Sequence, residues 1–234
     1  MTVGDIIKAV RWCYDEEKSN NVNFGNASSN DNTLMDNIIK AKIGDALRWV
    51  CLYAPAELLN GTDGTGSTGI LVDKANISPT SITGTTGGRI VLDATNHAGF
   101  IKIVRVRMED WHRAIKEPIS EDSEEYLQLY DSNGAAATID RPQAAIIDKA
   151  TKEIEVWPFT SGKKAQYTYV ADPGTTIDAT SADTDVLNIP PKVKTAFIYY
   201  LAFLVLTSYE DSRAARMLEI AKMNVSRTEN TQNK

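Results

Sequence analysis

The C-terminal fifth of the chain constrains the fold more than any other segment. Pro190 and Pro191 precede residues 195–206, which are almost entirely apolar and aromatic, and a charged stretch follows from Glu210. Two prolines fit the first turn of a helix, because the N–H groups that they lack would have no partner there. Apolar side chains on every side of a helix indicate that protein surrounds it. The sequence therefore predicts one long helix whose first half is buried and whose second half is exposed.

The same segment does not have the length of a membrane span. Its apolar run is shorter than the roughly 18 to 20 residues that a helix needs to cross a bilayer. From Tyr209 onward the pattern becomes amphipathic, with Met217, Ile220 and Ala221 on one stripe. A buried helix with an exposed, charged extension is typical of a subunit that assembles with other proteins.

Composition argues against several classes of protein. The chain has 234 residues, of which 42% are hydrophobic, and this is enough for a substantial core in one or two domains. The net charge of -6 argues against a dedicated binder of DNA or anionic membranes, because affinity for phosphates comes mainly from clustered Lys and Arg. Cys13 and Cys51 lie within apolar helical patterns, which favours two reduced, buried thiols. The N-terminus lacks the pattern of a signal peptide.

Helical periodicity also marks the N-terminal part of the chain. Thr2 and Asp5 have the spacing of a capping box, and apolar residues recur at helical intervals after them. A second helix with the same period ends near Pro55. We expect both helices to pack with the C-terminal helix in a bundle whose core includes Trp12 and Trp49.

The middle of the chain changes to the period of strands. Runs rich in β-branched and aromatic residues alternate with turn residues at 89–92, Phe100–Met108, 143–147, Glu153–Trp157 and 165–170. Phe100–Met108 alternates in two phases that switch at Ile103 and Val104, which predicts either a bulge or burial on both faces. Residues 148–152 and 161–163 have the composition of hairpin turns, and residues 120–130 have helical character.

The sequence therefore predicts an α+β fold: a small helical bundle with an inserted, antiparallel, β-rich subdomain. The N-terminal helices of the bundle occupy residues 1–60, and a Gly/Thr/Ser-rich loop occupies residues 61–88. The β-rich insertion then spans residues 89–185, and residues 186–234 hold the C-terminal helix and a polar tail.

Few residues are candidates for chemistry. Gly64, Gly66 and Gly69 have the spacing of a dinucleotide-binding motif, but that motif needs a strand before it and a helix after it, so a loop is favoured. His97 and His112 have no further ligand at metal-site spacing. We therefore predict no catalytic residue, no cofactor-binding residue, no metal ligand and no enzymatic activity.

Two charged clusters have both a functional and a structural interpretation. Asp178, Asp183 and Asp185 crowd one segment without the spacing of a calcium loop, which favours a solvated acidic loop. The basic residues of Phe100–Met108 and its continuation could form a patch for nucleic acid, although the solvent face of a strand is favoured. They could equally meet an acidic face on another subunit. These basic residues are Lys102, Arg105, Arg107, Arg113 and Lys116.

The order of these segments resembles a known family. A helical pair precedes a β-rich insertion with Arg89-Ile90-Val91-Leu92, Phe100–Met108 and Asp110-Trp111, and a C-terminal helix follows. This order resembles the head-to-tail adaptor (connector) proteins of tailed phages, of the tail accessory factor type found in short-tailed phages, and is similar to the ring proteins of crAss-like phages. In that family an aromatic-aliphatic run leads to a Tyr with an acidic residue and then to Ala-rich basic turns, as in residues 199–221.

The resemblance implies a structural virion protein at the junction of head and tail. Such a protein forms a homo-oligomeric ring, a dodecamer, that binds the portal protein and other tail or ring proteins. DNA passes through its channel without sequence-specific binding, no membrane is involved, and assembly takes place in the cytoplasm of the bacterial host. We expect the acidic residues of 121–125 or 178–185 to face the channel. The predicted contact residues are Met217, Ile220, Val225, Arg227, Lys102, Arg105 and Arg107.

Two alternatives stay open at this point. The insertion could be a carbohydrate- or protein-binding module whose aromatic side chains form a stacking platform. The platform residues would be Trp111, Trp157, Tyr167 and Tyr169. A cell-wall hydrolase would need paired carboxylates such as Glu124 and Glu125, but adjacent side chains on a helix point about 100° apart and do not face each other.

Overall fold

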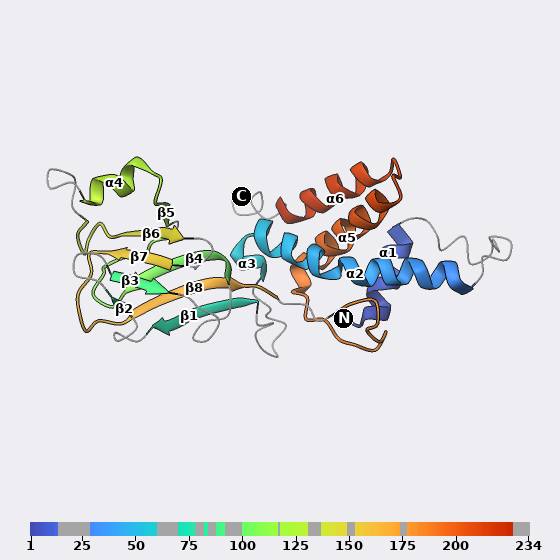
Figure 1. Ribbon diagram of the computed structural model, residues 1–234, viewed down its shortest axis with the longest axis horizontal. Helices are drawn as coiled ribbons and strands as arrows, with labels where there is room; N and C mark the ends of the chain where they lie inside the picture. Colours follow the sequence, from blue (N-terminus) through green and yellow to red (C-terminus); the bar gives the residue numbers. More distant parts are fainter. Residues whose placement is uncertain are drawn as a thin grey trace, which may run out of the picture. The chain divides into compact units, whose positions relative to one another are not determined.

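The computed structural model describes residues 1–13, 29–59, 70–77, 82–83, 88–91, 100–116, 118–130, 137–148, 153–173 and 177–226. The chain has an α+β fold, as predicted (Figure 1). It divides into two compact units, which we call the helical unit (Met1–Thr68 with Pro173–Lys234) and the β unit (Gly69–Asp172). The β unit is therefore an insertion between the two sequence segments of the helical unit.

The helical unit is built around one apolar helix, α5. Its elements are α1 (Val3–Cys13), α2 (Ser29–Tyr53), α3 (Ala56–Leu59), a 3-10 turn (Pro191–Val193), α5 (Lys194–Ser208) and α6 (Ala214–Ser226). α5 contacts α1, α2 and α6, and Figure 1 shows α5 and α6 side by side. Phe197, Leu201 and Val205 of α5 are fully buried in this core. None of the described helices has the length and apolar content needed to cross a membrane.

The start of α1 has the predicted capping box. The backbone N–H of Asp5 donates to Oγ1 of Thr2 at 3.1 Å, and the backbone N–H of Thr2 donates to Oδ2 of Asp5 at 3.3 Å. This reciprocal pair satisfies two donors that the first turn of a helix leaves without partners. The buried residues of α1 are Val3, Ile6, Ile7 and Val10.

The segment before α5 pairs with the start of α1. The backbone N–H of Val3 donates to the carbonyl oxygen of Asp185, and that of Gly4 donates to the carbonyl oxygen of Asp183, both at 2.9 Å. Lys40 of α2 is 9% exposed, and its Nζ donates to the carbonyl oxygen of Ser181 at 2.7 Å and pairs with Asp183 at 2.9 Å. This part of the chain, which we expected in the β-rich insertion, belongs to the helical unit.

The prediction of one long C-terminal helix is wrong. α5 and α6 are separate, and α6 folds back on α5 (Figure 1). Glu210 has a φ of 55°, which takes the chain out of the right-handed helical conformation. The backbone N–H of Asp211 then donates to the carbonyl oxygen of Leu206 at 3.1 Å, and Oδ1 of Asp211 accepts from the backbone N–H of Arg213 at 2.8 Å. These bonds satisfy backbone groups at the end of one helix and before the next.

The β unit contains two sheets that share one core. The first has the order β1 (Leu71–Ile77), β8 (Ala165–Ala171), β4 (Phe100–Met108) and is antiparallel. The second has the order β2 (Ile82–Thr83), β3 (Gly88–Val91), β7 (Glu153–Trp157), β6 (Gln143–Asp148), β5 (Ile119–Ser120), and only β5 and β6 run parallel. The short helix α4 (Glu124–Tyr130) follows β5. The core includes Val106, Trp111, Ile154 and Tyr167, so it takes side chains from both sheets.

The predicted strands are confirmed to within one residue at each end. The register of β4 against β8 shifts between Ile103 and Arg105, which confirms a bulge where the alternation changes phase. β7 and β8 belong to different sheets, so the prediction of a hairpin at residues 161–163 is wrong. For the other predicted turn, β6 and β7 are antiparallel neighbours, but residues 149–152 lie outside the described residues.

Two strands lie within the segment that was predicted to be a loop, residues 61–88. β1 includes Asp73, Lys74 and Asn76, residue types that are depleted in strands. Pairing with β8 nevertheless makes this segment the edge of the first sheet. β2 likewise pairs with β3. Tertiary pairing therefore decides the structure here, against local preference.

Candidate assembly surfaces

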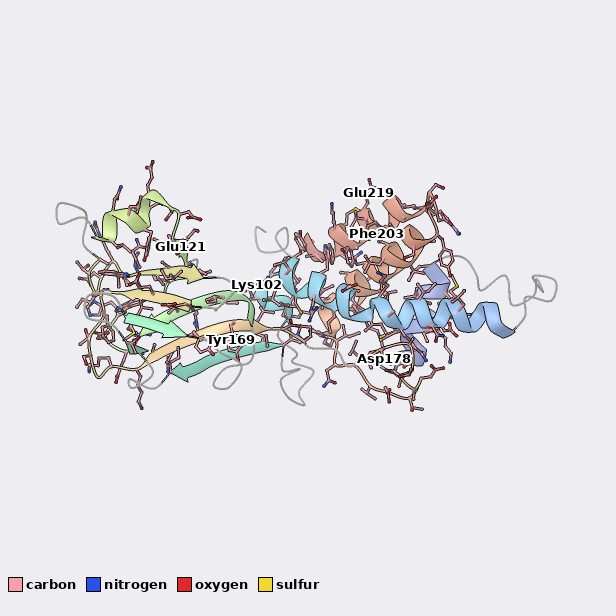
Figure 2. The ribbon with its side chains drawn as sticks, in the orientation of Figure 1. Lys102, Glu121, Tyr169, Asp178, Phe203 and Glu219 are labelled. Atoms are coloured by element: carbon pink, nitrogen blue, oxygen red, sulfur yellow. The ribbon has the colours of Figure 1, made fainter. Side chains whose placement is uncertain are left out.

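The helical unit has an open apolar groove between α2 and α6, with a volume of about 560 Å³. Because α5 contacts both of these helices, its side chains form the floor of the groove. Phe203, on α5, is labelled in Figure 2. The lining residues are Trp49, Tyr53 and Pro55 at the end of α2, Tyr200 and Phe203 from α5, and Leu218, Lys222 and Val225 from α6.

Aromatic packing shapes the groove. The rings of Trp49 and Tyr200 stack with their centroids 4.0 Å apart and their planes at 6°. Trp49 also contacts Tyr53, with 5.2 Å between ring centroids, and Tyr200 contacts Phe203 at 5.4 Å. Burial raises the pKa of Tyr200, and the nearby Tyr53 and Asp45 raise it further. Rings that hold one another in place make the groove a pre-organised site for an apolar side chain.

One face of α5 is only partly covered. The fully covered side holds Ala196, Phe197, Ile198, Leu201, Ala202, Val205 and Leu206. The half-buried residues of α5 are Tyr199, Tyr200, Phe203 and Leu204, of which Tyr200 and Phe203 line the groove. The expectation that protein surrounds α5 on every side is therefore wrong for the described part of this chain. Apolar surface that remains open in this way marks a site for a further partner.

Trp12 does not belong to the bundle core, contrary to our expectation. Its side chain is 62% exposed. The buried residues of α1, such as Ile6 and Val10, lie on one side of the helix, and a step of about 100° per residue puts Trp12 on the opposite side. Trp49, the other expected core tryptophan, is half-buried in the groove. Both tryptophans therefore contribute to the surface of the helical unit.

Three basic side chains of β4 share one face of their sheet, and we call Lys102, Arg105 and Arg107 the basic stripe. The register shift within β4 places Arg105 opposite Thr168 of β8, so all three residues avoid the core face. Nε of Arg105 donates to Oγ1 of Thr168 at 3.2 Å, and Nε of Arg107 donates to the carbonyl oxygen of Trp111 at 3.2 Å. Both arginines line a small pocket of about 90 Å³. The interpretation as the outer face of a strand fits this arrangement.

The predicted contact residues of α6 have different environments. Val225 is 6% exposed and lines the groove. Met217 is 7% exposed and does not line the groove, so it is buried by its own chain. Ile220 is half-buried, and Arg227 lies outside the described residues. The structure therefore brings Val225 to the groove. Sequence reasoning missed Tyr53, although its spacing of four residues from Trp49 was a visible signal for neighbours on one helical face.

A comparison with protein families gives these surfaces a context. The sequence model of the SU10 adaptor protein family matches residues 1–231. The chain belongs to this family. A search of curated proteins found no match. Membership makes the chain a structural adaptor of a phage and a component of the virion, which contacts other head or tail components. The resemblance to phage head-to-tail adaptors is thus confirmed at the level of the family.

Proteins of such an adaptor family are typically structural and not enzymatic. The described residues of this SU10 adaptor chain include no cluster of His, Cys, Asp or Glu that could hold a metal ion. Asp178 accepts hydrogen bonds from the hydroxyl and backbone N–H of Thr180, both at 2.7 Å, and these bonds lower the pKa of its carboxyl group. His112 is exposed and pairs with Asp140 at 2.5 Å. Residues 64–69 and His97 lie outside the described residues.

The β unit of this adaptor chain does not offer the predicted stacking platform. The four aromatic side chains are between 1% and 7% exposed, so they belong to the core. The indole N–H of Trp111 donates to the carbonyl oxygen of Pro158 at 3.0 Å, and the rings of Tyr167 and Tyr169 stack at 4.7 Å. Figure 2 shows Tyr169 on its strand, β8. Buried rings cannot stack on a sugar, so the alternative of a binding module loses the residues on which it depended.

Proposed function

We propose that this SU10 adaptor chain forms a homo-oligomeric ring, a dodecamer, that joins the portal to the tail and leaves a channel for DNA. The ring contacts the portal protein and other tail or ring proteins, and it is assembled in the cytoplasm of the bacterial host. Its architecture is that of the tail accessory factor type of short-tailed phages and is similar to the ring proteins of crAss-like phages. The family match over residues 1–231 supports a role as an adaptor.

The observation that carries the proposal is the apolar groove over α5. A subunit of a stable assembly leaves apolar surface for its partners, because burial of that surface drives association. The groove combines half-buried aromatic rings with an open volume of about 560 Å³. A helical unit with such a groove gains stability when a neighbouring protein covers it.

The charge distribution supports a channel that does not bind DNA. With a net charge of -6 per chain, a dodecamer carries about 70 negative charges, which repel a phosphate backbone. The acidic residues within 121–125 and 178–185 are exposed, and we propose that they face the channel. The basic stripe faces protein, since two of its arginines already donate to their own β unit. Counterions screen the repulsion within about 10 Å at moderate salt, so DNA can pass without tight binding.

A nonsense mutation of the gene in the phage that encodes this chain tests the proposal. Heads that contain portal but carry no tail are expected, and a plasmid copy of the wild-type gene should restore tailed particles. Electron microscopy of the restored particles should show a ring of the protein between portal and tail. Tailed particles that form without the chain would refute the proposal.

A matched variant controls for a hidden catalytic role. His112→Ala should restore tailed particles as well as the wild-type gene does, because the His112–Asp140 pair lies at the exposed surface. If His112→Ala gave intact particles that had lost a measurable hydrolytic activity, an enzymatic function would replace the structural one.

A further inference from the structure

The outward face of α1 has the pattern of a helix that docks on a partner. Asp5, Lys8 and Trp12 are exposed, and Ala9 between them is half-buried. At about 3.6 residues per turn these side chains lie opposite the buried stripe of α1. Tryptophan is enriched among the residues that dominate binding energies at interfaces, and alanine permits a close approach of two helices. This face, which we call the Trp12 face, leaves a large aromatic side chain without cover in the described residues.

The groove has complementary properties. Its volume of about 560 Å³ is within the range of about 300–1,000 Å³ that is typical of binding pockets, and four of its eight lining residues are aromatic. Charges of both signs flank it. Lys222 lines the side formed by α6, and Asp45 on α2 lies close enough to Tyr200 to raise its pKa.

We propose that the Trp12 face of one copy docks into the α2–α5–α6 groove of the next copy. This inference rests on the proposed ring and names its junction. Trp12 inserts among the aromatic rings, and Ala9 lets α1 approach α5. The Trp12 face carries one acidic and one basic residue, Asp5 and Lys8. Lys222, which lines the groove, has the charge opposite to Asp5, and Asp45, an exposed residue of α2 near Tyr200, has the charge opposite to Lys8.

The geometry of the helical unit makes this junction heterologous. The Trp12 face is on α1, whereas the groove is bounded by α2 and α6, so the two surfaces use different residues of one unit. Contacts between two different surfaces repeat from copy to copy and close into a ring when the rotation permits. A junction in which both copies use the same patch would instead stop at a dimer.

Two single variants test the junction with the full chain. Trp12→Ala removes the anchor, and Tyr53→Asp puts a charge on the rim of the groove at a side chain that is 60% exposed. Each should raise the dissociation constant of assembly at least about 10-fold in analytical ultracentrifugation, since buried tryptophan anchors have effects of this size. Leu127→Ala, which changes a side chain that is 65% exposed on α4, is the matched control and should assemble like the wild type. Unchanged thermal unfolding midpoints show that the variants are folded.

A mixture of the two variants gives a sharper result. Trp12→Ala retains an intact groove and Tyr53→Asp retains an intact Trp12 face, so an equal mixture should form a heterodimer with one functional junction and nothing larger. Native mass spectrometry resolves this species. A mixture that stays monomeric, or single variants that assemble like the wild type, would overturn the proposed junction.

The outcome separates this inference from the proposed function. If the wild-type chain and Trp12→Ala both form rings, the proposed junction is refuted, but the proposed ring is not. A wild-type chain that stays monomeric at high concentration also refutes the junction, because both surfaces exist in the free chain. A ring of this protein in phage particles would then still support the proposed function, and its absence there would refute that function.

Discussion

Replacing Lys40 by methionine should loosen the start of α1, although Lys40 lies on a different helix. The Nζ atom of Lys40 donates to the carbonyl oxygen of Ser181 at 2.7 Å and pairs with Asp183 at 2.9 Å. The segment that contains these two residues accepts hydrogen bonds from the backbone of Val3 and Gly4. Methionine keeps the length of the aliphatic side chain but cannot donate, so the variant removes the charge and its hydrogen bonds only.

The structure gives the size of this effect. A hydrogen bond from a charged group contributes about 1.5–3 kcal/mol. The ion pair adds less than about 1 kcal/mol, because the side chain of Asp183 is 66% exposed, whereas the side chain of Lys40 is only 11% exposed. We therefore expect Lys40→Met to lower the free energy of unfolding of the helical unit by about 2–3 kcal/mol.

Urea unfolding, followed by the ellipticity of the helices, measures this change. Hydrogen exchange at the amides of Val3 and Gly4 should also become faster, because their acceptors lie in the segment that Lys40 holds. Lys42→Met on the same helix is the matched control and should change stability by no more than about 0.5 kcal/mol. Equal unfolding curves for Lys40→Met and Lys42→Met, with unchanged amide protection, would refute the reasoning.

The connection between α5 and α6 should respond to acid. Hydrogen bonds from Arg213 lower the pKa of Asp211 from 3.8 to about 2, so its stabilising effect is present above the unfolded value and is lost as the pH falls toward 2. The unfolding midpoint of Asp211→Asn should therefore vary less than that of the wild type between about pH 4 and 2. Deleting residues 227–234, a polar segment, should keep the fold but weaken binding to purified portal in native mass spectrometry, and undiminished binding would contradict this. In fluorescence anisotropy at physiological salt the chain should not bind duplex DNA, and submicromolar, salt-sensitive binding would count against an acidic channel.

Local sequence signals predicted the elements whose structure depends on neighbours in the chain. The capping box of Thr2 and Asp5 is formed, and β4 and β7 have their predicted bounds. The change of phase in Phe100–Met108 marked a bulge, because side chains alternate with a fixed period of two in a strand. These features could be predicted because each arises from a few consecutive residues.

Contacts between distant residues decided the features that the sequence did not predict. β1 includes poor strand formers and exists through its pairing with β8. Lys40 has the sequence context of a surface lysine. In the structure it is buried, and its Nζ donates to the carbonyl oxygen of Ser181, which is 141 residues away in the chain. The turn after α5 was missed because Glu210 adopts a positive φ, for which glycine would have been the usual signal.

The candidate site was also only partly visible in the sequence. The position of Trp12 opposite Ile6 and Val10 on α1 was available from helical geometry, yet its apolar character suggested a core residue. The partly covered face of α5 could not be identified from the sequence, because the sequence of a helix that is apolar on all sides does not show which side the rest of the chain covers. Exposure therefore had to come from the tertiary structure.

The turn between α5 and α6 is what creates the groove. If α5 continued as one long helix, the apolar stripe of α6 would extend away from the bundle and no wall would stand opposite α2. The local bonds of Asp211 reverse the chain, so α6 covers part of α5 and contributes Leu218, Lys222 and Val225 as the second wall. Phe203 then lies on the floor between two walls, whereas Phe197, six residues earlier on the same helix, is fully buried. The same residue type thus stabilises the fold at one position of α5 and remains available for assembly at the other.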